Sequence, residues 1–395
     1  MSDDELLRAA IVARPDEDLP RLVYADFLQE AGHDDRAELI RVQCALERLP
    51  PADPERPELT RREAELLSTH LPAWRIAGLT GPQTFRRGMI ESVETTAEAL
   101  VRADPEVLRL APVRHLRLVN ADRWTADLAS LPLWRRLQSL SLNNNNFGAG
   151  NRMQLLDAAD MPELRSLSLR NNRLWPEAVQ QLAETRVAAQ LTRLDLSGNP
   201  VGDAGVATLA SHAAFTGLRE LISRSDELQE PDCVHDVGAT SIAESRTLTQ
   251  LEVLNFDSHY LTEDALFELA RSPNSNRLVE LDLSHNDFVL TNTFYYAGVG
   301  TPSHLRSLKR LNLAGNLITI TIAEYLAYWP RVASIEWIDL DLDLAPGKCG
   351  PRPKAISPQQ AEIRFRARRK QKSEWQRQNR VKQKIILAAQ GRGAP

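Results

Sequence analysis

The sequence predicts an α/β protein: a solenoid of repeated strand–turn–helix units that follows a small all-α module. The first observation is an internal repeat, and the second is helical spacing of apolar residues near the N-terminus. The third is size, because 395 residues with 43% apolar content can bury sizeable cores. Together these observations exclude a chain that is disordered throughout.

The repeat is visible in five segments that fit the pattern L-x-x-L-x-L-x-x-N-x-L, with an apolar residue of varied size at the eleventh position. These segments begin at Leu137, Leu164, Leu191, Leu278 and Leu308. Weaker copies begin at Val113, Leu218, Leu251 and Val332, and neighbouring starts lie 24 to 33 residues apart. A period of this length is typical of solenoid proteins.

The pattern has a structural reason. The alternating leucines face one side of a short strand, and the residues between them face the other side. The asparagine three positions after the last strand leucine turns inward, where its amide pairs with backbone groups of the turn. We therefore expect a buried ladder of Asn145, Asn172, Asn199, Asn286 and Asn316. Apolar residues at helical spacing follow each strand, as in Gly202 to His212.

These motifs resemble the leucine-rich repeat family, and NPVGDAGVATLA is similar to its ribonuclease-inhibitor-like subclass. The resemblance covers roughly Val113 to Leu342. It implies a horseshoe with parallel strands on the concave face and helices on the convex face. It also implies that the usual role is binding another protein.

Residues 1–82 do not follow the repeat and predict three short helices before Pro50 and a fourth at Leu59 to Trp74. This stretch resembles the repeat-companion domain, which precedes leucine-rich repeats in some bacterial families, although Phe27 stands where that family has Trp. The resemblance implies no known activity. The residues that carry it are Pro15, Asp16, Leu22, Val23, Tyr24, Ala25, Asp26, Gly32, Arg36, Ala37, Glu38 and Gln43.

Residues 83–112 are predicted to cap the first repeat with one strand, Phe85 to Thr95, and one helix. A terminal cap is needed because an end repeat otherwise exposes its leucine face. The repeats are then expected to occupy residues 113–345, and residues 346–395 a linker and a basic tail that is helical or disordered.

The tail has a charge opposite to that of the rest of the chain. From Lys348 onward there are 14 Lys and Arg residues against two acidic ones, which leaves a net charge of −17 for the preceding residues. The tail could bind nucleic acid, dock on this or another protein, or remain solvated, with an anionic membrane surface as a smaller possibility. The residues suited to nucleic-acid contact are Arg364, Arg366, Arg368, Arg369, Lys370, Lys372 and Trp375.

The exposed strand positions are polar and become more acidic toward the last repeats. They form either an ordinary soluble sheet surface or a binding site for a protein partner with a basic surface. The candidate partner-binding residues are Arg193, Asp195, Arg224, Asn255, Asp257, Glu280, Asp282, Arg310, Asn312 and Glu336.

No motif for catalysis or for a cofactor is recognisable, since a P-loop, H-E-x-x-H and G-x-S-x-G are all missing from the sequence. Arg21, Tyr24 and Asp26 are better explained by helix caps and ion pairs. Cys233 and His235 are too few for a zinc site, which needs three or four ligands. The repeat that contains them is six residues longer than its neighbours, and we expect the extra residues between Leu228 and Gly238.

The acidic N-terminus does not fit a signal peptide, and no apolar run approaches 18 residues. The cysteines are three and far apart, which argues against disulfides. We therefore expect a cytoplasmic, non-enzymatic interaction scaffold without cofactor, metal or small-molecule substrate. The alternative is a nucleic-acid-associated protein that binds through its tail and uses the repeats as a platform.

Overall fold

The computed structural model describes residues 2–148, 153–225, 233–288, 304–316 and 335–339. The chain divides into two compact units, unit 1 with residues 1–145 and 154–167, and unit 2 with residues 146–153 and 168–395. The predicted tail at residues 346–395 lies outside the described residues.

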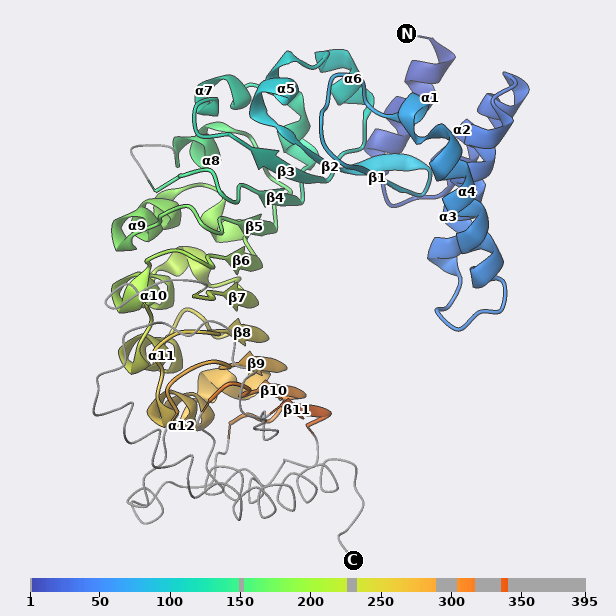
Figure 1. The fold of residues 1–395 in the computed structure, drawn as a ribbon. Coiled ribbons are helices and arrows are strands. Elements are labelled where there is room, and N and C mark those ends of the chain that lie inside the picture. Colours follow the sequence, from blue (N-terminus) through green and yellow to red (C-terminus); the bar gives the residue numbers. More distant parts are fainter. Residues whose placement is uncertain (1, 149–152, 226–232, 289–303, 317–334, 340–395) are drawn as a thin grey trace, which may run out of the picture. The chain divides into compact units, whose positions relative to one another are not determined.

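Unit 1 begins with helices and continues with a hairpin and the first parallel strands (Figure 1). The predicted N-terminal helices are present, and the first starts with a capping box in which Ser2 and Glu5 bind each other's backbone amides. The elements are α1 (Asp3–Ala13), α2 (Leu19–Glu30), α3 (Asp34–Arg48), α4 (Arg56–Trp74), β1 (Gln83–Arg86), β2 (Met89–Thr96), α5 (Ala97–Arg102), α6 (Pro105–Leu110), β3 (His115–Val119), α7 (Thr125–Leu128), the 3₁₀ helix η1 (Pro132–Arg136), β4 (Ser139–Ser141) and α8 (Gln154–Ala158).

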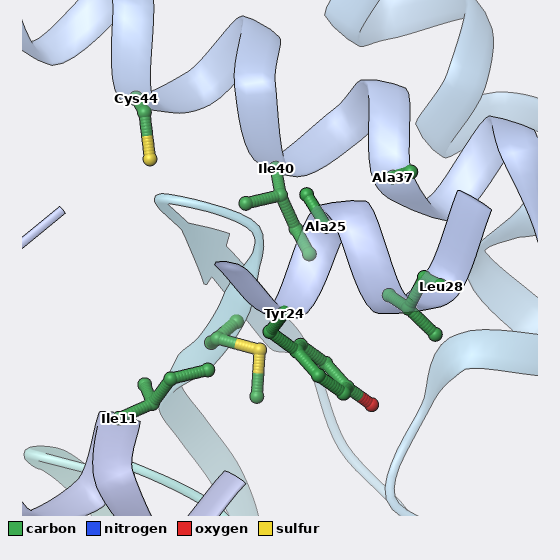
Figure 2. Packing of buried hydrophobic residues seen from close by; sticks show 8 residues of the cluster. Ile11, Tyr24, Ala25, Leu28, Ala37, Ile40 and Cys44 are labelled. Atoms are coloured by element: carbon green, nitrogen blue, oxygen red, sulfur yellow. The ribbon is translucent and has the colours of Figure 1, made fainter. Parts of the chain in front are cut away.

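The helical core of unit 1 joins α1, α2 and α3 to the hairpin. Ile11, Leu28 and Ile40 come from the three helices, and Met89 comes from β2 (Figure 2). Each of these side chains is at most 6% exposed. Burial of one such side chain stabilises a fold by about 1.5–3 kcal/mol, so this cluster holds the helices against the sheet.

The segment after the helices forms the hairpin β1–β2, where the sequence had indicated a single strand from Phe85 to Thr95. The two turn residues Arg87 and Gly88 have φ of +48° and +78°. A two-residue hairpin turn needs this geometry, and glycine adopts it without strain. A Cβ atom on Gly88 would lie 2.2 Å from Ile40 Cγ1. The Gly88 amide donates to Gln43 Oε1 at 2.6 Å, so the turn fits closely against α3. The predicted single helix after β2 is likewise two short helices, α5 and α6.

Unit 1 also buries an ion pair. Arg21 Nη2 lies 2.6 Å from Glu91 Oε1 and 2.7 Å from the Pro15 carbonyl oxygen, and both charged side chains are at most 2% exposed. Tyr24 donates to Asp4 at 2.8 Å, and Asp26 pairs with Arg41 on the surface. Arg21, Tyr24 and Asp26 therefore have partners that connect elements of unit 1.

Unit 2 consists of parallel strands that are adjacent in chain order, with helices after them (Figure 1). Strand β5 (Ser166–Ser168) lies at the boundary between the units. The elements that follow are α9 (Pro176–Glu184), η2 (Ala188–Gln190), β6 (Arg193–Asp195), α10 (Gly202–Ser211), η3 (Ala213–Phe215), β7 (Glu220–Ile222), α11 (Asp236–Ala243), β8 (Val253–Asn255), α12 (Glu263–Arg271), η4 (Pro273–Arg277), β9 (Glu280–Asp282), β10 (Arg310–Asn312) and β11 (Trp337–Asp339).

The repeated leucines form the core of unit 2. Leu191, Leu194 and Leu196, which are positions 1, 4 and 6 of one repeat, are all fully buried. Their counterparts in the strands on either side align with them residue by residue, as Leu194 does with Leu221 and Leu221 with Leu254. This is the predicted architecture, an α/β solenoid in which each strand buries its leucine side.

Candidate partner-binding site

Positions are numbered from the first leucine of each repeat, so that Leu191 is position 1 and Asn199 is position 9. We call the solvent-facing residues at positions 3 and 5 of β6 to β10 the strand face. They alternate with the buried leucines and are half-buried or exposed. The strand face consists of Arg193, Asp195, Glu220, Ile222, Val253, Asn255, Glu280, Asp282, Arg310 and Asn312.

The position 3 residues form a symmetric row with an arginine at each end, two glutamates inside them and a valine at the centre. In register order they are Arg193, Glu220, Val253, Glu280 and Arg310. Each glutamate pairs with the arginine on its outer side, since Arg193 Nη1 contacts Glu220 Oε2 and Arg310 Nη1 lies 3.4 Å from Glu280 Oε2. Among the described residues, no hydrogen bond reaches Oε1 of either glutamate. The row thus has two carboxylates at its centre, separated by an aliphatic side chain.

The position 5 side chains hold the turn that leaves each strand. Except for Ile222, each one accepts a hydrogen bond at Oδ1 from the backbone amide two residues later, at 3.0–3.1 Å. This short-range bond is an Asx turn, and it fixes the chain direction after the strand. The residues are Asp195, Asn255, Asp282 and Asn312. These residues, which the sequence suggests for partner binding, therefore also stabilise the repeat.

Asp257 lies at position 7 and connects three repeats. Its carboxylate is 6% exposed and contacts Arg224 Nε at 2.8 Å and His285 Nδ1 at 2.7 Å. It also accepts hydrogen bonds from the hydroxyls of Ser258 and Ser284, each at 3.0 Å. Burial by itself would raise the pKa of Asp257. The hydrogen bonds from His285 and Ser284 and the Arg224 charge outweigh burial and hold that pKa well below its usual range. Asp257 therefore stays ionised and fixes Arg224 and His285, of which the sequence analysis had selected only the arginine.

Position 9 carries the asparagine ladder. Asn199 Oδ1 accepts the amides of Asn172 and Leu174 at 2.7 and 3.1 Å, and Nδ2 donates to the Leu169 carbonyl at 2.9 Å. Asn286 makes the same two kinds of contact with Leu261 and Phe256. All the expected ladder residues are at most 7% exposed, namely Asn145, Asn172, Asn199, Asn286 and Asn316.

The repeat that begins at Leu251 has His259 at position 9. The ring is 3% exposed, and Nδ1 lies 3.1 Å from the Val234 amide nitrogen while Nε2 lies 2.6 Å from the Ser223 carbonyl oxygen. These are the same backbone groups that a ladder asparagine binds. Val234 therefore takes position 11 of its repeat, the place that counting along the sequence gives to Leu228. The sequence signal for His259 is the mismatch at position 9.

The last strand shows a different register from the one expected. Strand β11 pairs Leu311 with Ile338 and Asn312 with Asp339, so the repeat begins at Ile335, not at Val332. Glu336 consequently lies at position 2, where it contacts Lys309 Nζ, and not between two strand leucines. Asp339 takes position 5, and Trp337 takes position 3 and is 46% exposed.

Several predicted contacts fall outside the described residues, including the candidate nucleic-acid residues from Arg364 to Trp375. No group of three or more potential metal ligands occurs among the residues that the structure describes. Within the same residues, no helix has the length and apolar character needed to cross a membrane.

A family model for leucine-rich repeats matches residues 190–210, which contain β6 and most of α10. The fold is a leucine-rich repeat solenoid. No curated protein sequence matches the chain at a significant level. Among solved structures, a crystal structure of a TLR13–ssRNA13 complex is similar at 20% identity and a TM-score of 0.31, over 59% of this chain and 28% of that chain.

Proposed function

We propose that unit 2 is a protein-binding scaffold and that its partner presents a basic surface to Glu220, Val253 and Glu280. The observation that supports this most directly is the row of position 3 residues. Glu220 and Glu280 stand two strands apart, roughly 10 Å, because neighbouring strands are spaced by about 4.8 Å. The Oε1 atoms of these carboxylates can accept hydrogen bonds from a partner lysine or arginine.

The apolar residues beside the carboxylates suit the same kind of partner. Val253 and its neighbour Ile222 are half-buried and still reachable from solvent. Lysine and arginine side chains carry aliphatic stems that pack on such residues while the charged end binds a carboxylate. The Asx turns hold this surface in one conformation, which lowers the ordering cost of binding.

The test is affinity capture with the wild-type chain and with the double variant Glu220→Gln/Glu280→Gln. This variant removes two charges from half-exposed positions and keeps the side-chain shape. We expect proteins that bind the wild type at low salt to be lost, and we expect their binding to weaken as salt increases.

Glu252→Gln is the matched control, because Glu252 pairs with Arg219 at position 2, outside the central row. This variant should retain the captured proteins. If the double variant captures the same proteins at the same salt concentrations, the proposed surface is wrong.

Nucleic-acid binding through the basic tail is the second candidate, and the charge composition from Lys348 to Pro395 favours it. Lysine and arginine contacts with phosphates make binding fall steeply with salt. Binding to single-stranded RNA or DNA should then disappear in a chain that ends at Gly347. If the full chain still captures proteins after nuclease treatment and the shortened chain does not, the tail binds proteins directly.

We further propose that residues 1–82 form a repeat-companion-like module whose role is to hold the capping segment at residues 83–112. The contact of Gly88 with Gln43 and the burial of Met89 among α1–α3 support this role. We also infer a cytoplasmic, non-enzymatic protein. Cys44 and Cys233 are buried free thiols, as expected in a reducing compartment, and burial raises the pKa of Cys44 to about 11, which leaves it unreactive.

A further inference from the structure

His259 is a titratable residue at position 9, where Asn199 and Asn286 place an amide. An asparagine side chain has separate acceptor and donor atoms, and neither changes between pH 4 and 8. The histidine ring reproduces this arrangement in one tautomer. Because the Val234 amide donates to Nδ1, the single ring proton must lie on Nε2, where it is donated to the Ser223 carbonyl.

We propose that this contact is an acid-sensitive joint in the solenoid: protonation of His259 converts the acceptor for the Val234 amide into a second donor and releases that amide. The imidazolium would then place an N–H group against a backbone N–H group inside the protein. A buried donor without an acceptor is costly, so the neutral ring and the native contact depend on each other.

The surroundings of the ring agree with this geometry. The charged and titratable groups that face it are Asp257 on its own repeat and Asp203 and His235 on neighbouring ones. Burial lowers the pKa of His259 to about 4, against the raising effect of the Ser223 carbonyl and the two aspartates. Desolvation therefore outweighs the nearby negative charge, and the folded protein resists protonation.

The sign of the pH effect follows from this direction. The unfolded chain has an ordinary histidine pKa of 6.5, so between pH 6.5 and 4 it binds more protons than the folded chain. The contribution of His259 to stability is complete above pH 6.5 and is lost as the pH falls toward 4. The pKa of Asp257 is lowered from its ordinary value of 3.8, so the stability that Asp257 contributes is lost only below about that pH. Measurements from pH 7.5 to 5.0 thus exclude the effect of Asp257, and comparison with a His259 variant separates His259 from other histidines such as His115, whose pKa burial also lowers.

The experiment compares the full chain with His259→Asn, which installs the ladder residue of the other repeats. Urea unfolding should show that lowering the pH from 7.5 to 5.0 raises the wild-type unfolding constant roughly 30-fold more than that of the variant. Hydrogen exchange should show the protection of the Val234 amide falling in the same pH range in the wild type only. His70→Asn serves as the control, because it removes a histidine of unit 1 that pairs with Asp35, and it should keep the wild-type response at Val234.

Equal pH dependence of the wild type and His259→Asn would overturn the proposal. If the variant fails to fold, NMR titration of the wild-type ring decides the question. A ring that stays neutral to below pH 5 with the proton on Nε2 supports the joint, and a ring that titrates near 6.5 contradicts it.

Discussion

Residues 1–96 and the repeats both enclose polar groups, but residues 1–96 use an ion pair between Arg21 and Glu91, whereas the repeats use a ladder of uncharged amides that begins with Asn145 in unit 1 and continues through unit 2. Burial raises the pKa of Glu91 and lowers that of Arg21, so desolvation outweighs the attraction between them. The ladder amides carry no charge and lose little on burial when every atom is paired. The desolvation cost of the ion pair falls at one site. The stabilisation by the ladder is divided among several repeats, each of which contributes one paired amide.

The largest expected effect comes from breaking the ion pair in unit 1. Glu91→Ala should lower the free energy of unfolding by about 3–5 kcal/mol, because it leaves the Arg21 charge buried without a counterion. Urea unfolding at pH 7 measures this loss.

The double variant Arg21→Met/Glu91→Leu is the control, since it removes both charges and fills much of the same space. We expect it to be closer to the wild type than either single variant. If a single variant had the same free energy of unfolding as the wild type, neither buried charge would depend on the other for its stability.

The ladder should give a smaller loss at each position. Asn145→Ala removes the acceptor of the Ala121 amide and the donor to the Leu118 carbonyl, which lie 2.6 and 2.8 Å from the side chain. We expect a loss of about 2–3 kcal/mol in the free energy of unfolding, from buried groups left unpaired.

Asn143→Ala is the neighbouring control, because Asn143 is half-buried at position 7, whereas Asn145 is 2% exposed. Its loss should stay below about 1 kcal/mol, and any effect on partner binding should exceed its effect on stability. Equal losses at the two positions would contradict the assigned register.

The smallest effect is expected for surface charges between repeats. Arg219 and Glu252 lie 2.8 Å apart with side chains 54% and 38% exposed. A double-mutant cycle with alanine should give a coupling of about 0.5 kcal/mol or less. A coupling energy as large as the loss of about 2–3 kcal/mol expected for a ladder asparagine would contradict the view that exposed charge pairs contribute less than buried amides.

Much of the repeat could be predicted because its signal is periodic. The leucines at positions 1, 4 and 6 and the asparagine at position 9 recur at fixed spacing, and each must be buried for the turn to close. The same alignment contained the signal for His259, since a histidine at position 9 departs from the pattern.

The last repeat could not be assigned from its sequence, because Val332, Ile335 and Ile338 are all apolar and spaced by three residues. A shift of three positions therefore keeps apolar residues at the expected places. The pairing of Leu311 with Ile338 decides between the two registers and moves Glu336 off the strand face. The hairpin at Arg87 and Gly88 was missed because β1 is four residues long and Phe85 is its single apolar residue, which leaves no strand pattern to recognise.

The sequence by itself determined the strand–turn–helix repeat, its buried positions and the exposed strand positions, because each follows from local periodicity. Tertiary structure decided which exposed residues are available to a partner. Asp195 and Asp282 are engaged in turns, Asp257 is enclosed by Arg224 and His285, and Glu220 and Glu280 face outward beside Val253. The turns of Asp195 and Asp282 are local, but the roles of Asp257, Glu220 and Glu280 depend on contacts between residues 27 to 33 positions apart, which the backbone brings together only after the repeats have stacked.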